Sequence, residues 1–286
     1  MPIWIPITLA AAFVQNLRFM LQKQVRGAGL STGGATFARF VFSFPLAIAL
    51  AVTYAALSDQ DLPHPGHQFW MFALTGGLAQ ILATAFVVAL FALRNFTVGM
   101  TFKNTEVIQT ALVGFVVLGE SLSFWGIIAI CVGFVGVGFL ADPPEGGAGR
   151  FRVFNRAAAL GLLAGALFGV SAIGYRGASL SLPSGDVLLR ASFTLAVVTT
   201  FQTLIMLVWM RWREPGQVAK VFRAWRVTTM VGLTSMLGSL GWFAAFTLTS
   251  AAYVRVVGQV ELVFSYLASI FIFKETAGRR EIGASC

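Results

Sequence analysis

The sequence contains few charged residues, few cysteines and few histidines, and each shortage excludes a class of protein. Only 11% of the 286 residues are charged, while 57% are hydrophobic, which excludes an ordinary water-soluble domain. Cys131 lies in an apolar run and Cys286 at the last position, so they predict no structural disulfide framework. His64 and His67 lie outside the apolar runs, which leaves hydrolytic catalysis without a general base. We therefore expect no enzyme, no cofactor and no metal site.

Apolar runs of bilayer length are what the chain has in abundance. The mean hydropathy is +0.82, and a helix crosses about 30 Å of hydrocarbon with roughly 20 apolar residues. The sequence therefore predicts an all-α polytopic membrane protein. Nine spans are expected, at 3–21, 35–57, 69–93, 98–118, 124–140, 157–175, 186–210, 227–248 and 251–273.

Most of the positive charge lies in alternate connections between these spans. The formal net charge is +9, and lysine and arginine collect in the cytoplasmic loops of membrane proteins. The loop at 58–68 carries Asp59 and Asp61 instead. The pattern predicts a lipid bilayer as the environment, no nucleic-acid partner and an external amino terminus. The basic residues after the first, third, fifth and seventh spans are Lys23, Arg26, Arg94, Arg150, Arg152, Arg156, Arg211, Arg213, Lys220, Arg223 and Arg226.

Two glutamates inside apolar runs occupy matching positions of an internal repeat. Glu106 and Glu261 are separated by 155 positions, and so are Glu120 and Glu275. A repeat of five spans has an odd number of crossings, so its second copy enters the membrane in the opposite orientation. This inverted repeat is the plan of many secondary transporters, whose sites lie between the halves.

The repeat divides the chain into two unequal parts. Residues 1–141 are expected to form a first repeat of five helices, residues 142–156 a basic linker, and residues 157–286 a second repeat of four helices. The span that follows Glu120 has no counterpart after Glu275. We expect that a tenth span was lost by truncation or a frameshift, in preference to a genuine nine-helix design.

Three short motifs are similar to those of a known family. They are Leu-Gly-Glu-Ser-Leu at 118–122, Lys-Glu-Thr at 274–276, and Arg39-Phe40. On these motifs the chain resembles the EamA-type family of the drug/metabolite transporter superfamily, whose members have ten helices in two homologous halves. The resemblance implies a multi-pass protein of the bacterial inner (plasma) membrane that exports amino acids or related metabolites. It also implies cytoplasmic termini, against the external amino terminus that the loop charges predict.

The chain departs from that family beside both glutamates. Family members often carry a proline midway along the fourth and ninth helices, whereas Val107 and Leu262 follow the glutamates here. Without proline the backbone hydrogen bonds are not forced to break, so any hinge at these positions must come from packing.

The fourth span presents a polar face around its glutamate. Lys103, Glu106 and Gln109 are three positions apart, which places them on one face of a helix. These side chains are candidates for substrate binding or proton coupling, because a buried carboxylate is costly and marks a polar pathway. The open alternative is a Lys103–Glu106 salt bridge that only lowers the cost of burial.

Other candidates lie on the remaining spans. Arg39 and Arg190 form a further repeat-related pair, and Trp242 lies beside two glycines in the eighth span, where core packing is the alternative to lining a cavity. The surplus of buried basic residues suits an anionic or zwitterionic substrate. A simpler explanation for the remaining arginines is that they lie near helix ends and reach the headgroups with their side chains. These are Arg18, Arg176 and Arg255.

Together the features predict a secondary transporter of small polar metabolites, such as amino acids or related zwitterionic and anionic compounds. It would work by alternating access, with Glu106 and Glu261 binding a substrate ammonium or carrying a coupling proton, or with a counter-solute exchanged. The alternative is a membrane scaffold or lipid-handling protein that transports nothing and whose polar residues only hold helices together.

Overall fold

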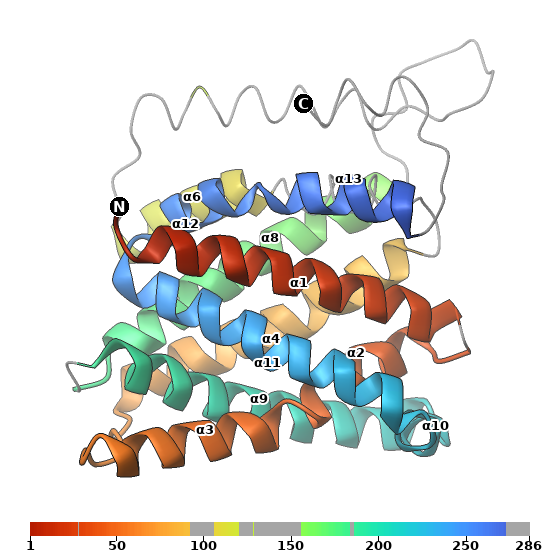
Figure 1. The fold of residues 1–286 in the computed structure, drawn as a ribbon, viewed down its shortest axis with the longest axis horizontal. Coiled ribbons are helices and arrows are strands. Elements are labelled where there is room, and N and C mark those ends of the chain that lie inside the picture. The colour runs from red at the N-terminus through yellow and green to blue at the C-terminus, as the bar shows by residue number, and fades with distance from the viewer. Residues whose placement is uncertain (28, 92–105, 120–127, 129–155, 184–185, 273–286) are drawn as a thin grey trace.

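The structure is a computed structural model (Figure 1), and its described residues form helices joined by turns, with no strand among them. Seven helical segments of this part of the chain are long and apolar enough to cross a membrane, so the protein is a multi-pass α-helical membrane protein. The structure describes residues 1–27, 29–91, 106–119, 128, 156–183 and 186–272.

Most of the expected spans coincide with helices. The expected span at 98–118 is represented by the helix that begins at Glu106, and the expected span at 124–140 lies almost entirely outside the described residues. The first helix continues to Gly27, two turns beyond the expected end. The helices are α1 (Trp4–Gly27), α2 (Thr32–Val41), α3 (Phe44–Leu57), α4 (His67–Leu90), α6 (Glu106–Leu118), α8 (Arg156–Leu180), α9 (Val187–Arg213), α10 (Gln217–Arg223), α11 (Trp225–Leu248), α12 (Ala251–Gly258) and α13 (Glu261–Phe271).

The second span is broken, where the sequence predicted one continuous helix. α2 ends at Val41 and α3 begins at Phe44, and the two together make one membrane-length segment. Pro45 follows the break. Proline has no N–H for the preceding turn and its ring clashes with the carbonyl four residues earlier, so the helix must bend here. Gly232 of α11 fits against the break, because a side chain there would collide with Phe42.

The helices of the first half pack mainly on helices of the second half. The most extensive contacts join α4 with α8 and α1 with α11, and α3 packs on α9. α1 and α8 run in opposite directions across the bundle in Figure 1. At the crossing of α4 with α8, a Cβ added to Gly174 would lie 2.8 Å from the Cα of Gly76, so the two backbones touch. Small residues permit this approach in lipid, where burial provides little drive between helices.

Several basic residues outside the core lie together at one end of the bundle. Arg26 ends α1, Arg211 and Arg213 end α9, and the short helix α10, which the sequence did not predict, adds Lys220 and Arg223. These ends lie together on the right of Figure 1, and the amino terminus lies at the opposite end. The segregation is the one that loop charges of a membrane protein produce.

Candidate functional site

The two glutamates that the sequence singled out, Glu106 and Glu261, line one hollow in the interior. Glu106 lies at the start of α6 and Glu261 at the start of α13, and each is 1% exposed. The hollow has a volume of about 190 Å³ including its mouth, and its interior has room for on the order of one water molecule. Trp242 of α11 and Arg255 of α12 complete its charged and aromatic wall. Residues from four helices therefore meet at this point.

Glu106 forms an ion pair with Arg255. The Arg255 Nε atom lies 2.7 Å from Oε1 of Glu106, and both side chains are buried. The N–H direction does not satisfy hydrogen-bond geometry, so the contact is an ion pair with an unaligned donor. A charge held in a low-dielectric interior needs such a partner, because an isolated one is very costly. The pairing links α6 of the first half to α12 of the second.

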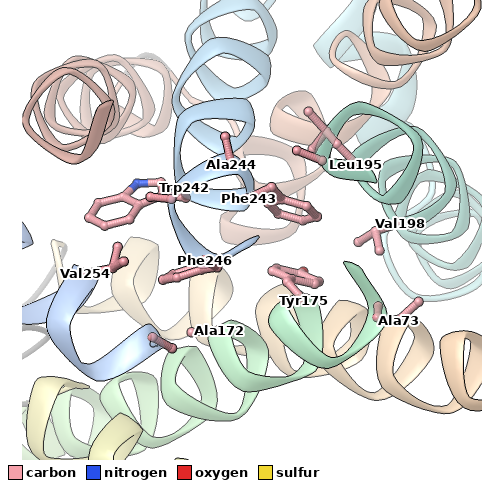
Figure 2. Packing of buried hydrophobic residues seen from close by; sticks show 14 of the residues in the cluster. Ala73, Ala172, Tyr175, Leu195, Val198, Trp242, Phe243, Ala244, Phe246 and Val254 are labelled. Carbon is pink, nitrogen blue, oxygen red and sulfur yellow. The ribbon is translucent and has the colours of Figure 1, made fainter. Parts of the chain in front are cut away.

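Aromatic rings on α11 hold the guanidinium of Arg255. Its Cζ atom lies 4.4 Å from the centre of the Trp242 ring and 5.1 Å from that of Phe246. Figure 2 places these two rings on the same helix, with Val254 of α12 close to Phe246. A cation over an aromatic face is attracted by the ring quadrupole, more strongly when water is excluded. The Nε1 donor of Trp242 is buried without a hydrogen-bond partner among the described residues.

Amide side chains of α1 bind Glu261 and its neighbour Ser265 on α13. Gln15 donates from Nε2 to Oε1 and Oε2 of Glu261, at 3.3 and 3.1 Å. One residue further along, Asn16 donates to Ser265 Oγ at 2.6 Å, and Ser265 donates to the carbonyl of Glu261. Hydrogen bonds to a buried carboxylate stabilise its charged form. The α1 side chains that contact α13 here, Gln15 and Asn16, are neutral amides.

The ninth span breaks immediately before Glu261. α12 ends at Gly258 and α13 begins at Glu261, and the N–H of Leu262 bonds the carbonyl of Gln259, three residues back. The absence of proline predicted that any hinge here would come from packing. Gly258 lies against Trp242, since a Cβ there would come within 2.6 Å of the indole. Hydrogen bonds from an N–H to the carbonyl three residues earlier pair the backbone groups of this turn, as a membrane interior requires.

Arg39 is buried apart from this hollow, in a cage of hydroxyl groups. It donates to Thr84 Oγ1 at 2.6 Å, to Ser235 Oγ at 3.1 Å and to Ser239 Oγ at 3.5 Å. Its expected counterpart Arg190 lies in the first turn of α9, only partly buried, and does not line the hollow. Neither arginine of the pair predicted from the sequence therefore lines the hollow.

Of the two further predicted residues on this span, Gln109 contacts another helix and Lys103 lies outside the described residues. Gln109 turns to α8, where its amide donates to the carbonyl of Leu162 at 3.2 Å. Lys103 lies outside the described residues, so its predicted pairing with Glu106 stays a prediction. The partner that the structure gives to Glu106 is Arg255, which helical spacing on a single span could not indicate.

The proposed headgroup contacts of three arginines are corrected by the structure. Arg18 is 1% exposed and Arg255 is 8% exposed, so both guanidinium groups lie in the interior. Arg176 donates to the carbonyls of Phe246 and Thr249, at 2.5 and 2.6 Å, where α11 ends. The last carbonyls of a helix lack intrahelical partners. Arg176 supplies that cap, and none of the three functions as a simple interfacial anchor.

A polar cluster that the sequence analysis missed joins α4, α8 and α9. Tyr175 donates to Gln80 Oε1 at 2.7 Å, and Gln202 donates to Gln80, to Tyr175 and to the carbonyl of Gly77. The ring of Tyr175 stacks on Phe243 at 4.2 Å, as Figure 2 shows. Glutamine within an apolar run was the available signal. The cluster holds the helices together, because each buried polar group needs a partner.

Comparisons with known proteins identify the fold and no family. No protein-family model and no curated protein matches the sequence. A solved structure, described only as a crystal structure of a protein, aligns over 96% of this chain and 93% of its own length, with a TM-score of 0.57 and 16% sequence identity. At this identity the likeness shows a shared fold alone. The fold and the site together define a multi-pass helical membrane protein with buried ionisable residues.

Proposed function

We propose that the protein is a secondary transporter of small polar metabolites that works by alternating access. One observation supports this above all: Glu106 and Glu261, from corresponding positions of the two halves, line the same buried hollow. Ionisable residues inside a membrane bundle are costly and usually serve a substrate or ion pathway. In the proposal these carboxylates bind a substrate ammonium or carry a coupling proton.

The packing of the halves supports an inverted repeat. If α1 corresponds to α8 and α4 to α11, the contact of α1 with α11 has its repeat-related equivalent in the contact of α8 with α4. The opposite directions of α1 and α8 in Figure 1 agree with such a relation. Sites in transporters of this plan lie near the bilayer midplane between the halves. The basic end of the bundle would then be cytoplasmic, and the amino terminus external.

The small size of the hollow fits an occluded conformation in this proposal. Room for about one water molecule does not hold a metabolite, so the halves must separate for a solute to enter. The break between α12 and α13 gives such a motion a place to occur, since Glu261 follows it directly. Broken helices at a central site are common in transporters. Resemblance to the EamA-type family leads us to propose amino acids or related metabolites as substrates.

A membrane scaffold is the second candidate, and one observation favours it. Glu106 already has Arg255 and Glu261 already has Gln15, so both carboxylates have partners that join helices. If holding helices together were their only role, replacing them would lower stability and no solute would be transported.

Removing the carboxylates is the direct test of transport. We expect Glu261→Gln to reduce uptake of labelled L-leucine, L-threonine and L-glutamate into proteoliposomes at least tenfold, because the amide neither carries a proton nor attracts an ammonium. The amide is nearly isosteric and can still accept from Gln15, so the fold is expected to persist. Glu106→Gln is expected to act in the same direction.

Asp61→Asn provides the control, because it removes an exposed carboxylate from the loop between α3 and α4. Its uptake should equal that of the wild type. The amount of folded protein in each preparation is compared by size-exclusion chromatography. Unchanged uptake and unchanged pH dependence in both glutamate variants would remove the carboxylates from the mechanism. No uptake of any solute by the wild type, together with unfolding of the variants, would favour the scaffold.

A further inference from the structure

Arg18 is a buried cation in the middle of α1. It is 1% exposed, and neither Nη1 nor Nη2 has a hydrogen-bond partner among the described residues. The Cζ atom of its guanidinium lies 4.0 Å from the centre of the Phe19 ring. Guanidinium carries five N–H donors and stays charged in proteins. An arginine with unused donors inside a membrane bundle is costly, and helix packing alone gives no reason to retain it.

A second buried arginine, Arg39, lies on α2, the helix that follows α1. Gln22, one turn after Arg18, donates to the carbonyl of Ala35, one turn before Arg39, at 3.0 Å. The helices α1 and α2 are consecutive and run in opposite directions. Arg18 and Arg39 therefore lie on the same side of this bond, each one turn from it, along the line of contact between the two helices, which we call the seam between α1 and α2. Two buried arginines therefore lie along the contact between α1 and α2.

Neither of these two cations has its own carboxylate among the described residues. Arg39 uses its donors on the three hydroxyl groups of Thr84, Ser235 and Ser239, which are neutral. Glu106, by contrast, lies against Arg255. The carboxylate oxygens of Glu261 accept hydrogen bonds from Gln15. The seam between α1 and α2 thus carries positive charge and free donors without a matching anion.

We propose that Arg18, with Arg39 beside it, binds the carboxylate of the transported solute. The inference rests on the proposed transport function and adds the substrate class, namely small organic carboxylates. A planar guanidinium with two free N–H groups matches a carboxylate in a bidentate arrangement, which lysine does not reproduce. In the proposed function, Glu106 and Glu261 bind an ammonium, and here that ammonium belongs to the same solute. Zwitterionic amino acids satisfy both requirements, and simple carboxylates satisfy the one that Arg18 imposes.

Thermal unfolding of the purified protein with a matched ligand panel tests the proposal. The carboxylates are L-leucine, L-glutamate, isovalerate and glutarate, and the counterparts without a free carboxylate are L-leucinamide, isovaleramide and isoamylamine. We expect at least one carboxylate to raise the unfolding temperature of the wild type, while its amide counterpart does not. Arg18→Met should lower the affinity of the protein for that carboxylate about 10- to 100-fold, as loss of charged hydrogen bonds does. Arg18→Lys should lower this affinity less.

Arg223→Met is the control, because it removes an exposed arginine from α10, and its carboxylate response should equal that of the wild type. The stability of Arg18→Met without ligand separates binding from a structural role. Removal of an unpaired buried charge should leave its unfolding temperature equal to or above that of the wild type, whereas removal of a structural support would lower it.

Three results would overturn the proposal. They are a carboxylate response that is unchanged in Arg18→Met, a panel in which no carboxylate shifts the unfolding temperature, and a clear loss of stability in ligand-free Arg18→Met. Proteoliposome uptake distinguishes this failure from failure of transport itself. If isoamylamine or L-leucinamide is transported and carboxylates are not, the proposed transport function is supported and the proposed carboxylate site at Arg18 is rejected. If no solute of either charge is transported, the proposed transport function is rejected as well.

Discussion

An Arg255→Met variant should unfold at a much lower temperature than the wild type. The substitution leaves the carboxylate of Glu106 buried beside Trp242 without the cation that lies 2.7 Å away in the structure. Breaking a buried ion pair by removing one partner costs about 3–5 kcal/mol, mainly because the remaining charge stays desolvated. Unfolding followed by tryptophan fluorescence or circular dichroism in detergent measures the loss.

The double variant Glu106→Gln with Arg255→Met provides the control for this prediction. It removes both charges, so most of the lost stability should return although the contact between α6 and α12 is weaker. The coupling between the two positions is the difference between the double variant and the sum of the single variants. An Arg255→Met protein as stable as the wild type would show that the two side chains do not pair in the folded protein.

Gly174→Val should be the most damaging single change in the packing between α4 and α8. A Cβ at this position would lie 2.8 Å from both the Cα of Gly76 and the carbonyl oxygen of Phe72. Both are backbone atoms, so no side chain can rotate away and the helices must separate. Overpacking usually costs about 1–3 kcal/mol, and the rigid neighbours place this variant near the upper value. The free energy of unfolding in a denaturant series in mixed micelles measures it.

Gly27→Val is the matched control for the glycine variant. Gly27 is the last residue of α1, and among the described residues no atom beyond its chain neighbours and its own helix backbone lies within 4 Å of a Cβ added there. Its stability should stay within about 0.5 kcal/mol of the wild type, as most exposed substitutions do. Equal losses in the two variants would mean that valine itself, and not the close crossing of α4 with α8, causes the effect.

The proposed mechanism requires that the contacts of the central site change during transport. In the structure the ion pair of Glu106 with Arg255 joins one half to the other, and the bond between Gln15 and Glu261 does the same. A solute that brings its own charges can replace such contacts, because an ammonium can take the place of a cationic partner. The difference in affinity between open and closed states then drives the change.

The positions of the glutamates could be predicted because a buried charge within an apolar run is visible in the sequence. Glu106 and Glu261 are 155 positions apart in the sequence, and the structure brings both to one hollow together with Trp242. Their partners could not be predicted in the same way. Helical spacing indicates contacts within one span, whereas Gln15 and Glu261 are 246 positions apart.

The same distinction applies to glycine and arginine. The sequence predicted that the ninth span had no forced break, and the packing of Gly258 on Trp242 accompanies the break that the structure contains. Arg18 and Arg255 lie near span ends in the sequence, which favoured the headgroup region, yet α1 extends further and carries Arg18 into the interior. Burial depends on which helices surround a position, and hydropathy along a single chain does not contain that information.

By itself the sequence determined that this chain is a helical membrane protein with ionisable residues inside its apolar runs, since hydropathy and charge spacing are local properties that the bilayer acts on directly. Only the tertiary structure decided that Glu106 faces Arg255, that Arg39 lies among hydroxyl groups, and that Arg18 has unused donors. The physical reason is that these pairings depend on contacts between helices distant in sequence. In the membrane interior, where water cannot compensate for a missing partner, those contacts decide how much each buried charge costs.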